Sequence, residues 1–518
     1  MADGPVQVVW FKRDLRVQDH AALHHAAAAG PVVLLYVFEP VVLSAPTSDR
    51  GQVGFVLESL LELDRELRAL GAFLTVRRGA VVDVLAALDD ELRALGGVAA
   101  VHGHEETGEL VTYARDRAVG QWLAGRGILW HEYPQNGVVR RLASRDGWSR
   151  RWQERMTAPV WPTPERLRSA LPVPARTQLP SLDELALPPS GVVARQPGGM
   201  AAAQATLASF LTERGEDYQR AMSSPVAGWQ ACSRLSPHLA WGTISVRTVY
   251  QALQARVAAV RALPRAARGG WLASLRGFGG RLRWHCHFMQ KLEDAPRLEC
   301  ENLHRGFDGL REDDWDEARF VAWCEGRTGY PMVDACMRCL RHTGWLNFRM
   351  RAMLVSFAAH HLWLHWRRVG EHLARCFVDY EPGIHWSQVQ MQSGVTGINT
   401  VRIYSPKKQL VDQDPEGVFV RRWVPELAKV PLAALAEPHR LSEAEQVAAG
   451  CRIGVDYPAP IVDHAAAVAA AKARIAARRR VGEVRAESRR VYEKHGSRKR
   501  PTARRGRRSA GEVRNPQV

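Results

Sequence analysis

Short apolar runs alternate with helix-like patterns over the first quarter of the chain. The runs are rich in β-branched residues and lie at 7–10, 31–38, 73–78, 98–102 and 128–133. Between them, apolar residues recur at helical spacing, for example over 53–70 and 87–95. Strands that alternate with helices predict a doubly wound parallel sheet within residues 1–135. The G-x-G-x-x-G and Walker sequences are absent from this region, so a standard dinucleotide or nucleoside triphosphate site is not expected.

The pattern changes twice after the predicted sheet. Residues 136–200 are Pro-rich and irregular, which predicts a connection that runs over the surface between domains. From about residue 201 the periodicity is almost wholly helical to about 437, and this part holds eleven of the seventeen tryptophans. We therefore expect a second, helical domain over residues 201–465. A chain of 518 residues is too long for a single core, which agrees with this division.

Residues 323–409 are apolar at helical spacing and yet carry fixed charges. Pro331 begins one predicted helix and Gly344 ends it, and a second helix is predicted from about Leu346 to Trp366. The charges within this region and after it are Arg349, Arg351, Asp379 and Glu381. Buried charge is tolerated when it is paired or bound to something, so these residues indicate a polar ligand.

Composition places the chain among ordinary globular proteins. It is 46% hydrophobic and 24% charged, it has no run of eighteen apolar residues, and it starts without a basic segment before an apolar one. We therefore expect no membrane span and a cytoplasmic location. The eight cysteines lack a framework spacing, and Cys336 and Cys339 form a single C-x-x-C inside an apolar helical pattern. Free thiols are expected rather than a metal site.

The net charge of +17 is concentrated at the C-terminal end. Residues 472–518 contain 17 Lys and Arg against 4 Asp and Glu, a net charge of +13. The segment begins with an Ala-rich, helix-compatible stretch and ends in R-K-R-P-T-A-R-R-G-R-R-S. This composition predicts a basic, largely disordered tail over 466–518, which would aid nonspecific DNA binding by releasing counterions.

Several ordered motifs resemble the photolyase/cryptochrome superfamily. They are W-F-K-R-D-L-R (10–16), C-S-R-L-S-P-H-L-A-W-G (232–242), E-G-R-T-G-Y-P-M-V-D-A-C-M-R (325–338), G-W-L-N-F-R-M-R (344–351), D-Y-E (379–381) and D-Y-P-A-P-I-V-D-H (456–464). The resemblance covers about residues 7–465. It implies an α/β antenna domain followed by an all-α domain that holds FAD.

The resemblance also implies which residues contact FAD. The matching positions are Tyr218, Cys232, Ser233, Arg234, Leu235, Ser236, Arg351, Asp379, Tyr380 and Glu381. Hydroxyl and N–H groups at a helix start suit a pyrophosphate, and Arg351 with Asp379 matches the ion pair beside the flavin ring. His104, Glu105 and Glu106 follow the fourth strand, where family members often contact a folate or deazaflavin antenna chromophore.

Members of the superfamily reduce the flavin through a chain of tryptophans. Trp366 matches the middle member, and Trp386 lies one residue from the position nearest the flavin. The distal position falls near Phe307, where this sequence has no tryptophan in register. Another route through Trp363 or Trp315 is therefore an open alternative.

The lesion pocket is where the sequence departs from the family. Trp284 matches an aromatic residue that stacks on a flipped pyrimidine dimer, but the positions around it carry unusual residues. Arg281 replaces Glu, His285 replaces Arg, Phe348 replaces Asn or His, Ala352 replaces Met or a second His, and Val389 replaces a second Trp. The candidates for contact with DNA or the lesion are Arg281, Trp284, His285, Phe348, Arg349, Lys407, Lys408 and Gln409.

Three functions are compatible with the sequence. The first is a deoxyribodipyrimidine photolyase, which acts on UV-damaged DNA and splits pyrimidine dimers by electron transfer from excited reduced FAD. The second is a cryptochrome-type photoreceptor that binds FAD without repair, which the altered lesion pocket and the C-terminal extension favour. The third, a small-molecule flavoenzyme or a light-independent nucleic-acid binder, fits the composition but not the motifs. We expect the first, in a monomer.

Overall fold

Five parallel strands form one sheet in the order β3-β2-β1-β4-β5. The computed structural model describes residues 4–398 and 400–496. The strands are β1 (Val6–Phe11), β2 (Val32–Phe38), β3 (Leu74–Arg78), β4 (Val98–His104) and β5 (Leu129–Tyr133). Each predicted apolar run overlaps one of them, and all four strand pairs are parallel, so the predicted sheet is confirmed.

Helices cover both faces of the sheet. The helices of this domain are α1 (Ala21–Ala29), α2 (Pro40–Leu43), α3 (Arg50–Ala69), α4 (Val81–Glu91) and α5 (Leu110–Arg126). Along β1, Val9 and Phe11 pack with α1 and α3, whereas Val8 and Trp10 pack with α4 and α5. Because successive side chains of a strand point to opposite faces, a strand that is covered on both faces is apolar throughout.

The connection between the sheet and the helical domain is less irregular than its composition predicts. It contains α6 (Trp148–Thr157), which packs against α11 (Val246–Ala262) of the helical domain. Trp152 on α6 is buried, and its ring meets the ring of Tyr250 edge-on at 5.1 Å. The connection therefore contributes a buried helix to the core of the helical domain.

The helical domain begins at α7. Its α-helices are α7 (Met200–Ser209), α8 (Tyr218–Ala221), α9 (Ala227–Ala231), α10 (Ser236–Ala240), α11 (Val246–Ala262), α12 (Trp271–Asp294), α13 (Glu317–Glu325), α14 (Pro331–Thr343), α15 (Phe348–His360), α16 (Trp366–Cys376), α17 (Pro382–Gln392), α18 (Pro406–Gln413), α19 (Val418–Trp423), α20 (Glu443–Ala448), α21 (His464–Arg479) and α22 (Gly482–His495). The largest buried cluster is built mainly from α14 to α17, which places the apolar centre of this domain in the region that sequence periodicity marks most strongly.

The predicted helix from Leu346 to Trp366 is wrong, because the chain forms two helices with a break between them. α15 ends at His360 and α16 begins at Trp366. Between them Trp363 has a φ of 58°, in the left-handed region that an L-residue cannot adopt inside a right-handed helix. The break is stabilised by tertiary contacts, since the Trp363 ring lies between the guanidinium groups of Arg311 at 4.4 Å and Arg474 at 4.8 Å.

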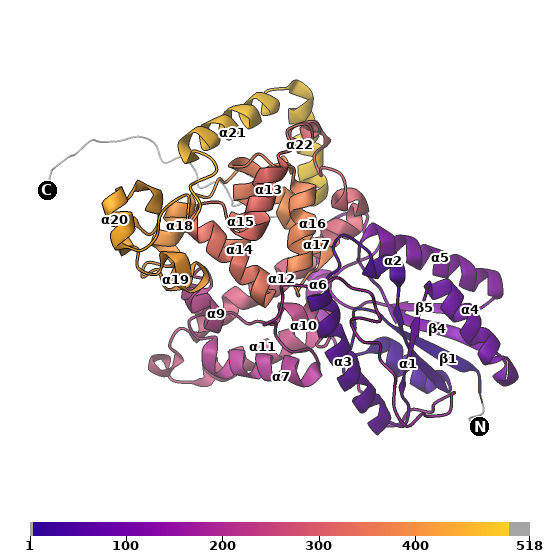
Figure 1. Cartoon of the computed structure of the whole chain (residues 1–518). Helices are drawn as coiled ribbons and strands as arrows, with labels where there is room; N and C mark the ends of the chain where they lie inside the picture. Colours follow the sequence, from indigo (N-terminus) through magenta and orange to yellow (C-terminus); the bar gives the residue numbers. More distant parts are fainter. Residues whose placement is uncertain (1–3, 399, 497–518) are drawn as a thin grey trace, which may run out of the picture.

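The first part of the predicted tail is helical, as its Ala-rich composition predicts, and the helical part extends further along the tail than expected. Residues 464–479 and 482–495 form α21 and α22, which lie against the rest of the helical domain (Figure 1). Ala471 and Ile475 of α21 are buried against Trp363, and Val484 of α22 joins the main core. The remaining part of the predicted tail, 497–518, lies outside the described residues.

Two smaller expectations concern the membrane and the thiols. Among the described residues, every helix is too short or too polar to cross a bilayer. All eight cysteines are free, as their spacing predicts. Burial raises the pKa of the Cys339 thiol to about 12, so this thiol stays protonated at neutral pH.

We expect Gly344→Ala to destabilise the helical domain. Gly344 ends α14 with a φ of 70°, and an added Cβ would lie 2.4 Å from Cγ2 of Val378. Strain of this kind costs about 1–3 kcal/mol, so the apparent Tm of the purified protein should fall by several degrees. Gly125→Ala is the matched control, because Gly125 lies in α5 with nothing within 4 Å of an added Cβ. An equal Tm for both variants would contradict this assignment.

Candidate functional site

The loop between α16 and α17 carries three consecutive polar residues that are held from three directions. Asp379 forms a two-pronged ion pair with Arg351 of α15, at 3.0 and 2.7 Å. The hydroxyl of Tyr380 donates to Oε1 of Glu109 in the α/β domain at 2.7 Å. Glu381 lies 2.7 Å from Nε2 of His285 on α12. Asp379 and Glu381, which the sequence marks as ligand-binding, are therefore fixed in one loop, and Arg351 holds that loop from α15.

The Arg351 side chain is locked in place by more than its carboxylate. Its Nε donates to the carbonyl of Leu346 at 2.7 Å, and its guanidinium lies 4.0 Å from the ring centre of Phe377. A planar guanidinium that bonds a carboxylate with two parallel hydrogen bonds has a fixed orientation. Arg351 and Asp379 are thus brought together as the sequence predicts, in a rigid arrangement.

The α/β domain holds the same loop through its backbone. Arg13, which directly follows β1 within the W-F-K-R-D-L-R motif, donates to the carbonyl of Tyr380 at 2.9 Å. Gln52 of α3 donates to the carbonyls of Ala374 at 2.7 Å and Phe377 at 3.1 Å. The position of this loop is consequently set by both domains together.

The pair formed by His285 and Glu381 is almost fully shielded from water. Each side chain is 11% exposed. Burial alone would lower the pKa of His285, but the Glu381 carboxylate overcomes it and holds the pKa well above the usual value. His285 is therefore a cation at neutral pH, placed next to the exposed Trp284 in the sequence.

The predicted phosphate-binding residues lie in a tight turn between α9 and α10. Arg234 occupies the turn with a φ of 61°, and its guanidinium lies 4.2 Å from the ring centre of Trp229 and 3.8 Å from that of Trp345, two rings that meet edge-on. The carbonyl of Ser233 accepts a hydrogen bond from Arg214 at 2.6 Å. Arg214 also donates to the carbonyl of Cys232. The carbonyls of Cys232 and Ser233 are thus occupied, and the N–H groups of Cys232 and Leu235 bond the Gly228 carbonyl and the Ser233 hydroxyl. The N–H and hydroxyl of Ser236 at the start of α10 are therefore the groups that suit an anion.

The other predicted contacts of this region are buried close to the turn. Leu235 is fully buried, Cys232 is buried, and Ser236 begins α10. Tyr218 begins α8 and packs edge-on against Phe210, with ring centres 5.7 Å apart. Burial raises the pKa of Tyr218 to about 12, so its hydroxyl remains a donor. Tyr218 and Cys232 both belong to one apolar cluster of the helical domain.

Buried polar atoms without a protein partner test whether this region fits FAD. Asn347, Arg349, Ser387, Gln388 and Gln409 each have one such side-chain atom. They come from the start of α15, from α17 and from α18, the elements that surround the polar loop or follow it. Buried polar groups are normally hydrogen-bonded, so these donors and acceptors suit a large polar ligand. The residues present therefore fit a dinucleotide such as FAD.

Two of the predicted relay tryptophans are neighbours in the core. The ring centres of Trp366 and Trp386 are 5.8 Å apart in an edge-on arrangement, and both residues are buried. Nε1 of Trp366 donates to Oδ1 of Asn302 at 2.7 Å. Phe307, at the position expected for a distal tryptophan, is buried. Of the two alternatives, Trp363 is buried beside Arg311, and Trp315 is partly exposed beneath Arg368.

Two aromatic side chains of the predicted lesion pocket reach the solvent. Trp284 on α12 is 42% exposed and Phe348 at the start of α15 is 52% exposed. Arg281 is also exposed, one helical turn before Trp284. Other residues predicted to contact DNA are buried or already paired. Gln409 is only 6% exposed, and Lys408 pairs with Asp412 at 3.1 Å. Lys407 pairs with Glu437.

The predicted antenna residues lie at the boundary of the two domains. Glu105 and Glu106 line a cavity of about 30 Å³ together with His285 and Glu381, which is room for one or two waters. Glu106 is engaged in an ion pair with Arg115 at 2.7 Å. Although burial opposes ionisation, the neighbouring cations lower the pKa of Glu106 to about 2. The cavity therefore borders the polar loop itself.

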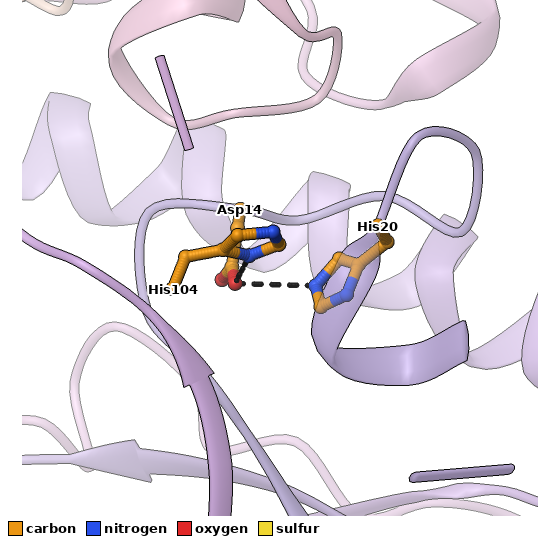
Figure 2. Close-up of side chains that lie close together, drawn as sticks. All are labelled: Asp14, His20 and His104. Carbon is orange, nitrogen blue, oxygen red and sulfur yellow. Dashed lines mark hydrogen bonds and ion pairs between the residues drawn. The ribbon is translucent and has the colours of Figure 1, made fainter. Parts of the chain in front are cut away.

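His104, the third predicted antenna residue, belongs to a buried cluster instead. Figure 2 shows His104 and His20 converging on Asp14. Nδ1 of His104 is 2.7 Å from Oδ2 of Asp14, and Nε2 of His20 is 3.1 Å from the same oxygen. A distance of 2.7 Å is a hydrogen-bond length, shorter than the separation of about 3.3 Å between two ligands of tetrahedral zinc. The buried Arg16 adds a positive charge beside Asp14.

This cluster fixes the centre of the sheet. Asp14 follows β1, His104 ends β4, and His20 caps α1 by accepting from the N–H of Leu23. Strands β1 and β4 are the neighbours at which the winding of the sheet reverses. We conclude that the three side chains pin the two central strands and α1 together at the edge that faces the helical domain.

Sequence reasoning missed the contacts that join distant parts of the chain. Glu109 and Arg13 hold the polar loop, although neither was predicted as a site residue. Asn302 holds Trp366 and was missed as well. Arg13 stands inside a recognised motif, which was the one available signal. Glu109 is separated from Tyr380 by 271 residues, and no local pattern links them.

The comparisons with known proteins agree with this site. The family model for the FAD binding domain of DNA photolyase matches residues 278–477, and the DNA photolyase model matches residues 7–144. Cryptochrome DASH of Gloeobacter violaceus is 31% identical over 88% of this chain and 93% of that protein. The deoxyribodipyrimidine photo-lyase of Halobacterium salinarum is 31% identical over 89% of this chain and 96% of that protein.

A solved structure gives the same result for the fold. The bacterial class III photolyase of Agrobacterium tumefaciens superposes with a TM-score of 0.79 at 27% identity, over 93% of this chain and 99% of that one. Fold and site together define an FAD-binding protein with an α/β domain followed by a helical domain. The chain belongs to the photolyase/cryptochrome family.

Arg351→Met should weaken the retention of FAD. The change leaves the buried Asp379 carboxylate without its cation, which costs about 3 kcal/mol and loosens the polar loop. We expect a lower ratio of flavin to protein absorbance after purification, together with a lower Tm. Arg327→Met is the control, since Arg327 pairs with Glu325 at an exposed position. Full flavin content in the Arg351 variant would show that the pair does not support the cofactor.

The stabilisation from His285 and Glu381 should depend on pH. The pKa of His285 is raised in the folded protein, so the stabilisation is complete below its unfolded pKa of about 6.5 and is lost as the pH rises through the folded value. Glu381→Gln should therefore lower stability most near pH 6, by about 1.5–3 kcal/mol. The difference in Tm between the two proteins should shrink towards pH 9. A difference that grows with pH would contradict the assignment.

Proposed function

We propose that this protein repairs UV-induced pyrimidine dimers in DNA in a light-dependent reaction. The observation that carries the proposal is the position of Trp284. This exposed aromatic residue directly precedes His285, and His285 is paired with Glu381 of the polar loop. A flipped base that stacks on Trp284 would therefore lie next to the flavin-binding region. The relatives named deoxyribodipyrimidine photo-lyase support the same reaction.

The residues of the chain bind and orient the damaged strand in this proposal. Trp284 and Phe348 offer exposed aromatic faces for unstacked bases, and Arg281 offers a positive charge to a phosphate. FAD in its reduced form, when bound, supplies the light-excited electron that opens the dimer. The ion pair of His285 with Glu381, at 2.7 Å, fixes the side of the site that adjoins Trp284.

Trp386 and Trp366 have a separate role in the proposal. Their adjacent buried rings provide a route by which an electron enters the flavin region from the protein. The hydrogen bond from Trp366 to Asn302 fixes the orientation of the second ring. These two residues are needed to prepare the reduced cofactor by light, and they do not touch the damaged DNA.

A cryptochrome-type photoreceptor is the second candidate. Phe348 and Ala352 lack the polar groups, and Val389 lacks the second aromatic ring, that the family pattern places around the lesion. In addition, Arg474 of α21 lies on the ring of Trp363, so the C-terminal helices contact the region of the alternative electron route. A photoreceptor would use light-driven changes at such a contact for signalling, without repairing DNA.

A repair assay with two reduction methods separates these roles. The full chain, loaded with FAD, is mixed with a UV-irradiated oligonucleotide under blue light, and loss of cyclobutane and (6-4) lesions is followed by chromatography. We expect repair by the wild type. Trp366→Phe should repair normally after reduction with dithionite but at least about tenfold more slowly after reduction by light alone. Trp284→Ala should lose repair under both conditions.

The outcomes distinguish repair from signalling. If the FAD-loaded protein is photoreduced but removes neither lesion, the repair proposal is wrong and the photoreceptor is favoured. If Trp366→Phe is photoreduced at the wild-type rate, the relay does not run through this residue. Trp423→Phe is the matched control, because Trp423 is partly exposed, packs against His342 and belongs to neither of the electron routes considered.

A further inference from the structure

A second cavity lies between the C-terminal helix and the loop that follows α12. Its volume is about 270 Å³, far more than one water requires and near the lower limit for small-molecule sites. Its walls come from residues 295–305 and 487–495, and none of its lining residues belongs to the α/β domain. We call it the α22 cavity. It is separate from the polar loop and from the boundary cavity next to Glu105.

Positive charge dominates the walls of the α22 cavity. Arg490 and Lys494 of α22 face it and form no ion pair within the described part of the chain. The carboxylates in the wall are already engaged. Glu301 lies 3.1 Å from both Arg297 and Arg305, and Glu487 accepts from the backbone N–H groups of Arg305 and Gly306. The cavity therefore has two free cations and no free carboxylate among its described lining residues.

A buried histidine adds a donor to the same wall. His495, the last residue of α22, is 3% exposed, and its Nδ1 has no hydrogen-bond partner. Burial, with nearby Arg145 and Lys494, lowers the pKa of His495 to about 3, so the ring is neutral and can donate one N–H. A buried polar atom without a partner in a cavity wall points to a ligand.

The interior beyond His495 is also basic. Lys291 of α12 is 8% exposed, and its ammonium lies 5.2 Å from the ring centre of Phe288. Burial and the nearby Arg145 lower its pKa to about 8. The carboxylate of Asp294 forms an ion pair with Arg145 at 2.8 Å, which leaves the charge of Lys291 unbalanced among the described residues. The potential at this end of the cavity is consequently positive, which favours an anion.

The rest of the wall is apolar. Leu298 and Val491 are buried, and Leu303 lies beside them. The amide of Asn302 also lines the cavity, and its oxygen accepts the hydrogen bond from Trp366 at 2.7 Å. A ligand in this cavity would therefore combine an anionic group near α22 with an apolar or aromatic body.

We propose that the α22 cavity binds a small organic phosphate of about mononucleotide size. Its phosphate group would bind Arg490, Lys494 and the N–H of His495, and its body would cover Leu298 and Val491. Two cations and a neutral donor suit a dianionic phosphate. The site does not depend on the proposed repair reaction, although Asn302 places the bound molecule one side chain away from Trp366.

Titration calorimetry with AMP as the probe tests this site. The full chain is used with FAD already bound, so that the flavin site is filled. We expect one AMP per chain, displaced by inorganic phosphate at higher concentration. The double variant Arg490→Ala, Lys494→Ala should bind AMP at least about tenfold more weakly. The control is Arg489→Ala, because Arg489 is an exposed neighbour on α22 that does not line the cavity.

Each alternative outcome overturns the proposal. No heat of binding with AMP in the millimolar range means that the cavity is not a phosphate site. Equal weakening by Arg489→Ala means that general surface charge, rather than the cavity, attracts AMP. If succinate binds as tightly as AMP, the site does not select phosphate. If the double variant keeps AMP but loses affinity for duplex DNA, these residues belong to a DNA-binding surface. Unchanged Tm and flavin content confirm that the variants are folded.

Discussion

The loop of Asp379, Tyr380 and Glu381 is the constraint on which the rest of this structure depends. Its two carboxylates are buried, and a buried charge without a partner would cost several kcal/mol, so each must have a cation. Arg351 and His285 supply them from different helices of the helical domain. Tyr380 and its carbonyl are bonded by Glu109 and Arg13 from the α/β domain. One short segment thus aligns α12, α15 and the sheet domain.

This arrangement separates the buried partners of the polar loop from the exposed aromatic residues of the proposed lesion pocket. The partners of the loop face inwards and cannot change without leaving a charge unpaired. Trp284 and Phe348 lie on the outer side of the same helices, where exposure allows substitution at little cost to stability. The chain resembles the family at Arg351, Asp379 and Trp284, and its departure at Phe348 falls at an exposed position.

The sequence predicts most of the fold for identifiable physical reasons. Strands that are covered on both faces must be apolar throughout, so the five runs are visible without any structure. Pro331 and Gly344 mark the ends of α14 because each has a backbone preference that suits a helix end. The break at Trp363 could not be predicted from the local sequence. The residue has a left-handed backbone where its ring contacts Arg311 and Arg474, which lie far from it along the chain. Likewise, the charge of the tail concealed Ala471 and Ile475, which pack against that ring.

The candidate site follows a similar division. Arg351 and Asp379 could be predicted because charges in an apolar region must be paired or bound to a ligand, and the resemblance to the family indicates that the ligand is FAD. Glu109 could not be predicted as a site residue, because it contacts Tyr380 only when the two domains meet.

The central claim is that the α/β domain holds the polar loop of the proposed FAD site in place. The rate of FAD release after rapid dilution measures it. Glu109→Ala should release FAD about tenfold faster, whereas Glu109→Gln, which keeps an oxygen for the Tyr380 hydroxyl, should resemble the wild type. Release from Glu109→Ala at the wild-type rate would contradict the account.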